Sequence, residues 1–99
     1  MVDGEAGVKI LVTGGCGFLG SNLAAHWLGA GEAVSIIDAL YRPGSDVNLH
    51  WLEGMAAHRQ LTFYRQDVSD EKGVGSVFRK DGPFDLVYHL AAMAARACA

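Results

Sequence analysis

The stretch TGGCGFLG at residues 13–20 decides the fold of this chain. It follows the apolar run VKILV at residues 8–12 and opens a helix-like stretch, so its glycines at positions 14, 17 and 20 lie at a strand-to-helix turn. A helix N-terminus offers unpaired amides and the positive end of a dipole to phosphate groups, and glycine leaves the backbone open to close approach. The stretch predicts a site for a phosphate-bearing ligand. The alternative is an ordinary glycine-rich turn.

Each of these three glycines has its own physical reason. Gly14 lets the chain turn sharply out of the strand, Gly17 lets a pyrophosphate lie against the backbone, and Gly20 lets the helix pack closely on the sheet. Phe18 and Leu19 stand between the last two glycines, at the start of the predicted helix. We therefore expect these five residues to form the phosphate-binding part of a nucleotide site.

The composition indicates one small packed domain. Of 99 residues, 51% are hydrophobic and 19% charged, which argues against disorder. The formal net charge of −3 gives no reason to expect nucleic acid or an anionic membrane surface as a partner. Residues 1–7 have no apolar core, and glycines and polar residues interrupt the uncharged residues 10–31. We expect neither a secretory signal nor a membrane-spanning helix.

The cysteines and histidines suggest neither disulfides nor a metal. Cys16 and Cys98 are too few and too far apart for a disulfide framework, so we expect a cytoplasmic location. Cys16 lies near a helix N-terminus, where the pKa of a thiol can fall. We interpret it as a space-filling residue, with a reactive thiol as the alternative. The histidines have no spacing with the cysteines that indicates a metal site.

Apolar runs and helical periodicities alternate along the chain. The runs at 10–12, 34–37 and 86–88 show little polar alternation, as in strands buried on both faces of a parallel sheet. They predict strands at residues 8–13, 33–38, 61–66 and 85–90. Helical spacing of apolar residues predicts helices around 18–28, 49–56 and 74–78. We expect Ser69 to be the N-cap of the last helix, and Trp27 and Trp51 to lie in the core.

This order predicts an α/β fold: the N-terminal half of a doubly wound (Rossmann) parallel sheet, with four strands alternating with helices. We divide the chain into a flexible leader at 1–7, a partial nucleotide-binding domain at 8–92 and an alanine-rich end at 93–99. In a complete fold the fourth strand would have a further neighbour, and here its apolar residues are expected near an uncovered edge. We interpret the chain as a fragment.

Asp38 ends the second predicted strand, about 20 residues beyond the glycines. A carboxylate at this position can accept hydrogen bonds from the hydroxyls of an adenosine ribose, and it would repel a 2′-phosphate. It therefore selects NAD as the cofactor. Arg42 instead favours NADP, since its guanidinium could pair with the 2′-phosphate of that cofactor. The remaining alternative is an acidic cap in a loop.

Asp67 and Val68 follow the third predicted strand, where the adenine would lie. The Asp67 carboxylate could accept a hydrogen bond from the exocyclic amine while Val68 packs on the ring. The alternative is a turn leading into the helix, with Asp67 solvated.

The fourth predicted strand ends in a histidine and three small or apolar residues, His89, Leu90, Ala91 and Ala92. A histidine at the end of a buried strand is more often structural than catalytic, and we interpret His89 as structural. We expect Leu90, Ala91 and Ala92 to run alongside the nucleotide.

Together these residues resemble the extended short-chain dehydrogenase/reductase family, the NAD-dependent sugar-nucleotide epimerases and dehydratases. The matching features are TGGCGFLG at 13–20, Asp38, QDV at 66–68 and HLAA at 89–92. Within the family, GGCGFLGSNLA at 14–24 and NLHWL at 48–52 favour a 2-epimerase subgroup. The resemblance implies that NAD takes a hydride from a sugar carbon and returns it to the other face. It also implies a nucleotide-sugar substrate and homo-oligomeric full-length relatives.

The family's proton-transfer tyrosine lies in a Tyr-x-x-x-Lys motif, and none of the three tyrosines here has a lysine four residues later. We therefore assign no catalytic residue and expect no turnover by this chain alone. Ala39 and Tyr41 stand where relatives often carry asparagine and a small residue, so part of the ribose contact departs from the family pattern. Two alternatives stay open: a 4-epimerase or 4,6-dehydratase fragment, and a non-catalytic nucleotide-binding or interaction module.

Overall fold

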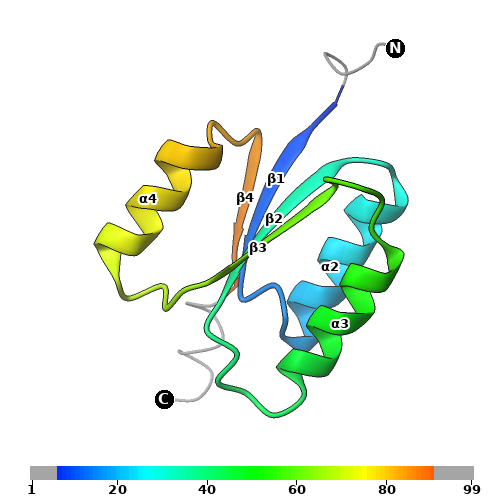
Figure 1. Ribbon diagram of the computed structural model, residues 1–99, viewed down its shortest axis with the longest axis horizontal. Helices are drawn as coiled ribbons and strands as arrows, with labels where there is room; N and C mark the ends of the chain where they lie inside the picture. Colours follow the sequence, from blue (N-terminus) through cyan, green and yellow to red (C-terminus); the bar gives the residue numbers. More distant parts are fainter. Residues whose placement is uncertain (1–6, 91–99) are drawn as a thin grey trace.

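The computed structural model describes residues 7–90 and confirms the predicted fold class (Figure 1). The elements are β1 (Lys9–Thr13), α2 (Phe18–Gly29), β2 (Ala33–Asp38), α3 (Ser45–Met55), β3 (Leu61–Arg65), α4 (Glu71–Asp81) and β4 (Leu86–His89). All pairings are parallel, and the strand order β3-β2-β1-β4 is that of the first half of a doubly wound sheet. The predicted strand bounds are right to within one residue. The expectations for residues 1–6, Ala91, Ala92 and 93–99 lie outside the described residues.

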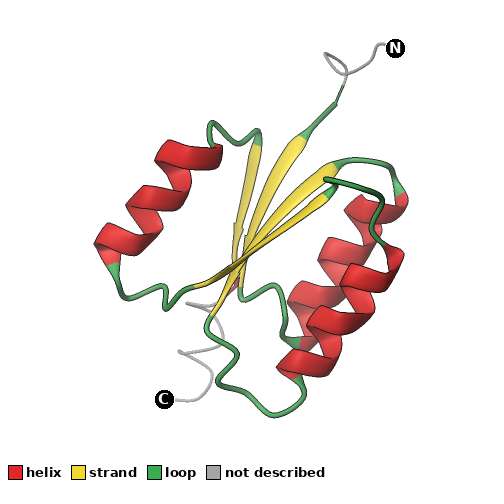
Figure 2. Cartoon of the chain, in the orientation of Figure 1, coloured by secondary structure: helices red, strands yellow, loops and turns green. Residues whose placement is uncertain are grey.

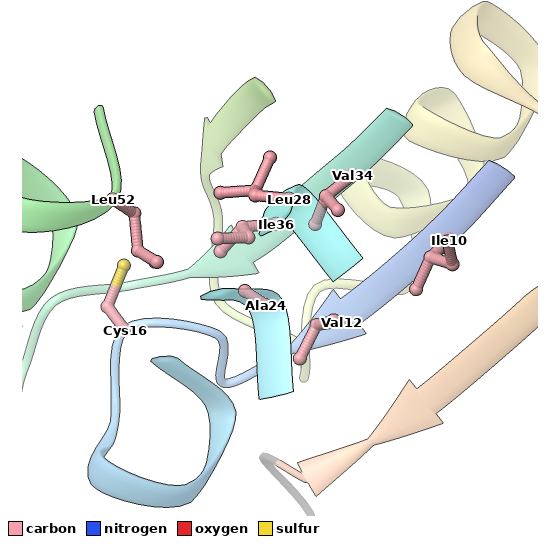
Figure 3. Packing of buried hydrophobic residues seen from close by; sticks show 8 residues of the cluster. All are labelled: Ile10, Val12, Cys16, Ala24, Leu28, Val34, Ile36 and Leu52. Carbon is pink, nitrogen blue, oxygen red and sulfur yellow. The ribbon is translucent and has the colours of Figure 1, made fainter. Parts of the chain in front are cut away.

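The central strands β1 and β2 are buried on both faces because their apolar residues are nearly continuous. α2 and α3 cover one face of the sheet, and α4 covers the other (Figure 1). The first face holds a core cluster of Ile10, Val12, Cys16, Ala24, Leu28, Val34, Ile36 and Leu52 (Figure 3). On the second face, Leu11 and Ile37 pack against Val77 of α4. Each fully buried aliphatic side chain contributes about 1.5–3 kcal/mol, so these clusters hold the helices against the sheet.

A polar cluster lies at the C-terminal end of α4. The Asp81 carboxylate pairs with Lys9 Nζ at 3.0 Å and accepts hydrogen bonds from the buried hydroxyl of Ser35 and, at 3.4 Å, from Tyr64. Burial alone would raise the pKa of Asp81, but the hydrogen bonds from Ser35 and Lys9 and the Lys9 charge together lower it below its ordinary value. Lys9 also offsets the unfavourable position of a carboxylate at a helix C-terminus.

The prediction that Ser69 caps α4 is wrong by one residue. The N-cap is Asp70, whose side chain accepts a hydrogen bond from the Gly73 amide at 3.1 Å. Both the amide and the hydroxyl of Ser69 instead donate to Asp67 Oδ1, at 2.9 and 2.8 Å. Because the Asp67 carboxylate engages Ser69 in a local turn, the next carboxylate along the chain takes the capping position.

The prediction of two core tryptophans is right for one of them. Trp27 packs against the core cluster beneath α2 and α3. Trp51 is 50% exposed, because its neighbour Leu52 takes the fully buried position on α3. Trp51 lies instead among exposed apolar side chains that include Val47 and Met55. The helical spacing of Leu49, Leu52 and Ala56 did mark the buried face, since all three lie in or against the core cluster, and only the separate expectation for Trp51 is wrong.

The β4 strand carries the exposed apolar residues that its sequence predicts. Leu86 and Val87 are 39% and 48% exposed, whereas Tyr88 and Leu90 pack against the core cluster. Within residues 7–90, no helix has the length and apolar character that crossing a bilayer requires.

Candidate nucleotide site

The loops that follow β1, β2 and β3 leave the sheet at the same end, the carboxyl ends of the parallel strands (Figure 2). Ligands of open α/β sheets bind at this end. The glycine loop, residues 14–17, joins β1 to α2 there. Gly14 has a φ of 73°, and its amide donates to the Ile37 carbonyl at 2.8 Å. This left-handed conformation favours glycine, as the sharp turn out of β1 predicts.

The other loop glycines differ in what surrounds them. A Cβ on Gly20 would collide with the Gly14 carbonyl and lie 2.8 Å from the Gly15 Cα, so Gly20 lets α2 pack on the loop backbone rather than on the sheet. A Cβ on Gly17 would lie 3.4 Å from the Gly14 carbonyl oxygen, an ordinary contact. Sequence reasoning missed Gly15, where a Cβ would lie 2.7 Å from Ile36 Cγ2. The signal available in the sequence was that Gly15 lies just after one predicted buried strand, where a neighbouring buried strand leaves little room for a side chain.

The start of α2 is open to solvent. The N-cap Gly17 makes no side-chain cap hydrogen bond, and the first turn holds no acidic residue. The first amides of a helix have no partner within it. Phe18 and Leu19 in this turn are 84% and 59% exposed. The arrangement offers amide donors and the positive end of the helix dipole to an anionic group.

Asp38 lies beside this loop, at the end of β2. Its Oδ2 accepts a hydrogen bond from the Cys16 amide at 2.9 Å, and its Oδ1 accepts one from the Leu40 amide at 2.7 Å. A carboxylate has about four acceptor positions, so each oxygen keeps the capacity for a further hydrogen bond. The structure therefore brings Asp38 and the glycine loop together, as the spacing predicts.

Cys16, the one loop residue with a side chain, is fully buried in the core cluster, where Leu52 lies nearby (Figure 3). Burial raises the pKa of the Cys16 thiol to about 12, and the charges of Asp38 and Glu53 add to the shift. Because the thiolate is the reactive form, the structure supports the space-filling interpretation over a reactive thiol.

The loop after β2 contains a residue in an uncommon backbone conformation. Leu40 has a φ of 63°, in the left-handed region that bulky residues rarely adopt. The hydrogen bond that its amide donates to the Asp38 carboxylate and its packing on the core cluster hold it there. Arg42 is exposed in the same loop, and its carbonyl accepts a hydrogen bond from the Ser45 hydroxyl at 2.7 Å.

The loops after β2 and β3 meet at Asp67. The hydroxyl of Tyr41 donates to Asp67 Oδ2 at 3.4 Å. The pKa of Asp67 is lowered, chiefly by the hydrogen bond from the Ser69 amide and then by that from its hydroxyl. Val68 is half-buried beside it. The carboxylate is thus part of a local turn, in keeping with the alternative from the sequence, and the turn leaves Asp67 at the carboxyl end of β3.

His89 has a structural partner. Its Nδ1 lies 2.8 Å from the hydroxyl of Thr13, its direct neighbour across the β1–β4 pairing. This contact supports the structural interpretation of His89. Leu90 is half-buried against the core cluster. Within residues 7–90, no three His, Cys, Asp or Glu side chains gather in a way that could hold a metal ion.

Sequence reasoning also missed Asn48. Its Nδ2 donates to the Cys16 carbonyl at 2.8 Å, which ties α3 to the glycine loop across 32 residues of sequence. An asparagine inside a helix carries no local signal for such a distant contact.

Comparison with known proteins identifies the family. The sequence model of the GDP-mannose 4,6 dehydratase family matches residues 11–96. The chain is 40% identical over 88 residues to the CDP-paratose 2-epimerase of Salmonella typhi, a match that covers 89% of this chain and 25% of that protein. The chain thus spans about a quarter of the length of the curated relatives it matches.

Comparison with solved structures points to the same family as the comparison of sequences. The structure is similar to the UDP-Glc/GlcNAc 4-epimerase of Campylobacter jejuni, with a TM-score of 0.72 and 32% identity over 84% of this chain and 24% of that one. It is also similar to the Bordetella bronchiseptica enzyme WbmG, solved in complex with NAD, with a TM-score of 0.71 and 30% identity over 90% of this chain and 26% of that one. The resemblance inferred from the sequence is confirmed. Since the family match runs over most of its length, the chain belongs to the GDP-mannose 4,6 dehydratase family, among the short-chain dehydrogenase/reductase enzymes that act on nucleotide sugars.

Proposed function

We propose that this chain is the NAD-binding portion of a nucleotide-sugar epimerase similar to CDP-paratose 2-epimerase. The observation that carries the proposal is the uncapped start of α2 beside Asp38. It offers amide donors for a diphosphate next to a carboxylate for the ribose, which is the pairing that a dinucleotide requires.

The residues present fit the two central groups of NAD. The Cβ position of Gly17 is free of close protein contact, so a glycine there is explained by a ligand rather than by packing. Asp38 keeps acceptor capacity for the ribose hydroxyls. The residues that we propose to hold the pyrophosphate and this ribose are Gly14, Gly17, Phe18, Leu19, Gly20 and Asp38.

The outer part of the proposed site surrounds the adenine. The Tyr41–Asp67 hydrogen bond brings the loops after β2 and β3 to one place at the sheet edge, which supports an adenine position between them. The residues proposed for this part are Arg42, Asp67 and Val68. Leu90, Ala91 and Ala92, at and after the end of β4, are proposed to run alongside the nucleotide.

When bound, the nicotinamide would accept a hydride from a sugar carbon and return it to the opposite face. This chain's residues bind and orient the cofactor, and the sequence holds no Tyr-x-x-x-Lys pair to move the proton. We propose that the chain has no turnover by itself. In the full-length protein, further residues would bind the nucleotide sugar, in a cytoplasmic homo-oligomer.

Two other functions have specific support. A 4-epimerase or 4,6-dehydratase is supported by the fold similarity to a 4-epimerase and by the family match. A non-catalytic nucleotide-binding module is supported by the exposed Leu86 and Val87 on β4, which could dock on another chain.

Isothermal titration of the folded chain with NAD tests the cofactor role. Saturable binding is expected, with weaker binding of NADP and no binding to a Gly17→Val variant that keeps its circular dichroism spectrum. A folded wild-type chain that binds no NAD at millimolar concentration would contradict the proposal.

The sugar specificity is tested on the full-length protein with CDP-paratose and UDP-glucose, the products being identified by NMR. Inversion at carbon 2 of the CDP-sugar is expected. Turnover of the UDP-sugar alone would favour the 4-epimerase. NAD binding without turnover of either sugar would leave the 4,6-dehydratase and the non-catalytic module, which GDP-mannose as a third substrate would separate.

A further inference from the structure

Side chains from two other elements hold Cys16 by its backbone. Its amide donates to Asp38 at the end of β2, at 2.9 Å, and its carbonyl accepts a hydrogen bond from Asn48 on α3, at 2.8 Å. The Cys16 carbonyl and the Gly17 amide belong to one planar peptide unit. Asn48 therefore holds the carbonyl side of the peptide plane that leads into the N-cap Gly17, while the Gly14 carbonyl accepts a hydrogen bond from its amide side at 3.1 Å.

We propose that Asn48 is a positioning residue for the diphosphate of the bound dinucleotide, an inference that rests on the proposed function. Glycines stand on both sides of Cys16, and their backbone angles are the least restricted of any residue. The loop has an internal hydrogen bond, from the Gly17 amide to the Gly14 carbonyl, and the bonds from Asp38 and Asn48 fix it to the rest of the fold. By fixing the Cys16 carbonyl, Asn48 sets the direction in which the amides of Phe18 and Leu19 face the ligand.

α3 is itself well placed to hold this bond. Leu52 lies one helical turn after Asn48 on the same face, and it is fully buried in the cluster that contains Cys16 (Figure 3). The packing of Leu52 thus fixes the position of α3 along its axis and its rotation about that axis, relative to the glycine loop. Asparagine is a weak helix former, and Asn48 is only half-buried. Its hydrogen bond to the loop explains its position better than helix propensity or burial does.

The contact requires a donor. A carbonyl oxygen only accepts, so aspartate at position 48 would place an acceptor against an acceptor and add a negative charge near the phosphates. Glutamine keeps the amide donor on a longer side chain. His50 lies on the same helix and is exposed, with its Nδ1 3.9 Å from Glu53 Oε1, and His50→Ala is the matched control.

The experiment compares Asn48→Ala, Asn48→Asp, Asn48→Gln and His50→Ala in the whole chain, each shown to be folded by circular dichroism. Affinities for NAD and for inorganic pyrophosphate are measured by titration, and hydrogen exchange is followed at the amides of residues 16–19. We expect Asn48→Ala to weaken both affinities about fivefold to tenfold and to speed exchange at these amides. Asn48→Asp should lose more, Asn48→Gln should stay nearer the wild type, and His50→Ala should change neither measurement.

The outcomes separate the two proposals. A wild-type chain that binds NAD, with equal affinity in Asn48→Ala, overturns the positioning role and leaves the cofactor role standing. A loss of affinity without faster exchange at residues 16–19 also overturns it. A wild-type chain that binds neither NAD nor pyrophosphate overturns the proposed function itself. Should Asn48→Ala fail to fold, the comparison of Asn48→Asp with Asn48→Gln decides the same question, because they differ in the donor.

Discussion

The carboxylate of Asp38 accepts a hydrogen bond from the amide of Cys16 at 2.9 Å and so joins the end of β2 to the glycine loop. The same carboxylate is the group that we propose for the ribose of NAD. One side chain would then both shape the loop and select the cofactor. Asparagine loses the charge and keeps one acceptor oxygen, so it can accept from only one of the two amides, of Cys16 and Leu40, that Asp38 binds.

The first prediction concerns cofactor choice. Asp38→Asn should remain folded, while its preference for NAD over NADP falls about tenfold, since the negative charge that repels a 2′-phosphate is gone. Titration with both cofactors measures the ratio, and Asp46→Asn at the exposed start of α3 is the control. An unchanged ratio would mean that Asp38 shapes the loop alone.

The second prediction contrasts two glycines of the loop. Gly17 has φ −75° and ψ 176°, which alanine adopts readily, so Gly17→Ala should change the free energy of unfolding by less than about 1 kcal/mol. Its NAD affinity should nevertheless fall at least tenfold, because the methyl group occupies the ligand's side of the loop. Gly20→Ala should destabilise the fold by about 2 kcal/mol or more, since its Cβ would collide with the Gly14 carbonyl.

Urea unfolding and NAD titration measure the two effects separately. If Gly17→Ala bound NAD as tightly as the wild type, the diphosphate would not lie against this loop. If Gly20→Ala were as stable as the wild type, the close packing of α2 on the loop backbone would be wrong.

Local patterns predicted the parts of the fold that local forces decide. All four strands were located to within one residue. For β1 and β2 the reason is that strands buried on both faces must be apolar nearly throughout. The glycine spacing located the loop, because few residues other than glycine adopt the positive φ found at position 14.

Contacts between distant residues could not be predicted in this way. The bonds of Cys16 to Asp38 and to Asn48 span 22 and 32 residues, and nothing near Asn48 in the sequence marks it as a partner of the loop. The exposure of Trp51 depends on how α3 rotates against the sheet, which Leu52 decides. Helical spacing placed Leu52 on the apolar face, and the error was to place its neighbour Trp51 in the core as well.

The third prediction concerns the Cys16 thiol. Because burial raises its pKa to about 12, almost no thiolate is present at pH 8 in the folded chain. In a Cys98→Ser background, we expect a disulfide reagent such as DTNB to modify Cys16 at least about a hundredfold more slowly in the native chain than in urea. Equal rates would indicate that the loop opens freely, and adding NAD should slow native modification further if the cofactor closes the loop.

The fourth prediction concerns the dependence of stability on pH. The pKa of Asp81 lies below its ordinary value of 3.8 in the folded chain, so the folded state binds the proton less tightly than the unfolded state. The ion pair with Lys9 therefore stabilises the fold above about pH 4, and this contribution is lost as the pH falls through the folded-state pKa.

Acid unfolding followed by circular dichroism measures this loss. Asp81→Asn keeps the shape of the side chain and cannot titrate, so its stability should be lower at pH 7 and should fall less steeply below about pH 4. Asp46→Asn, at an exposed position, should keep the wild-type slope. If the Asp81→Asn and wild-type curves ran parallel, another carboxylate would have to carry the acid sensitivity. Asp85, whose carboxylate accepts the Lys9 amide at 2.8 Å, would be the next residue to substitute.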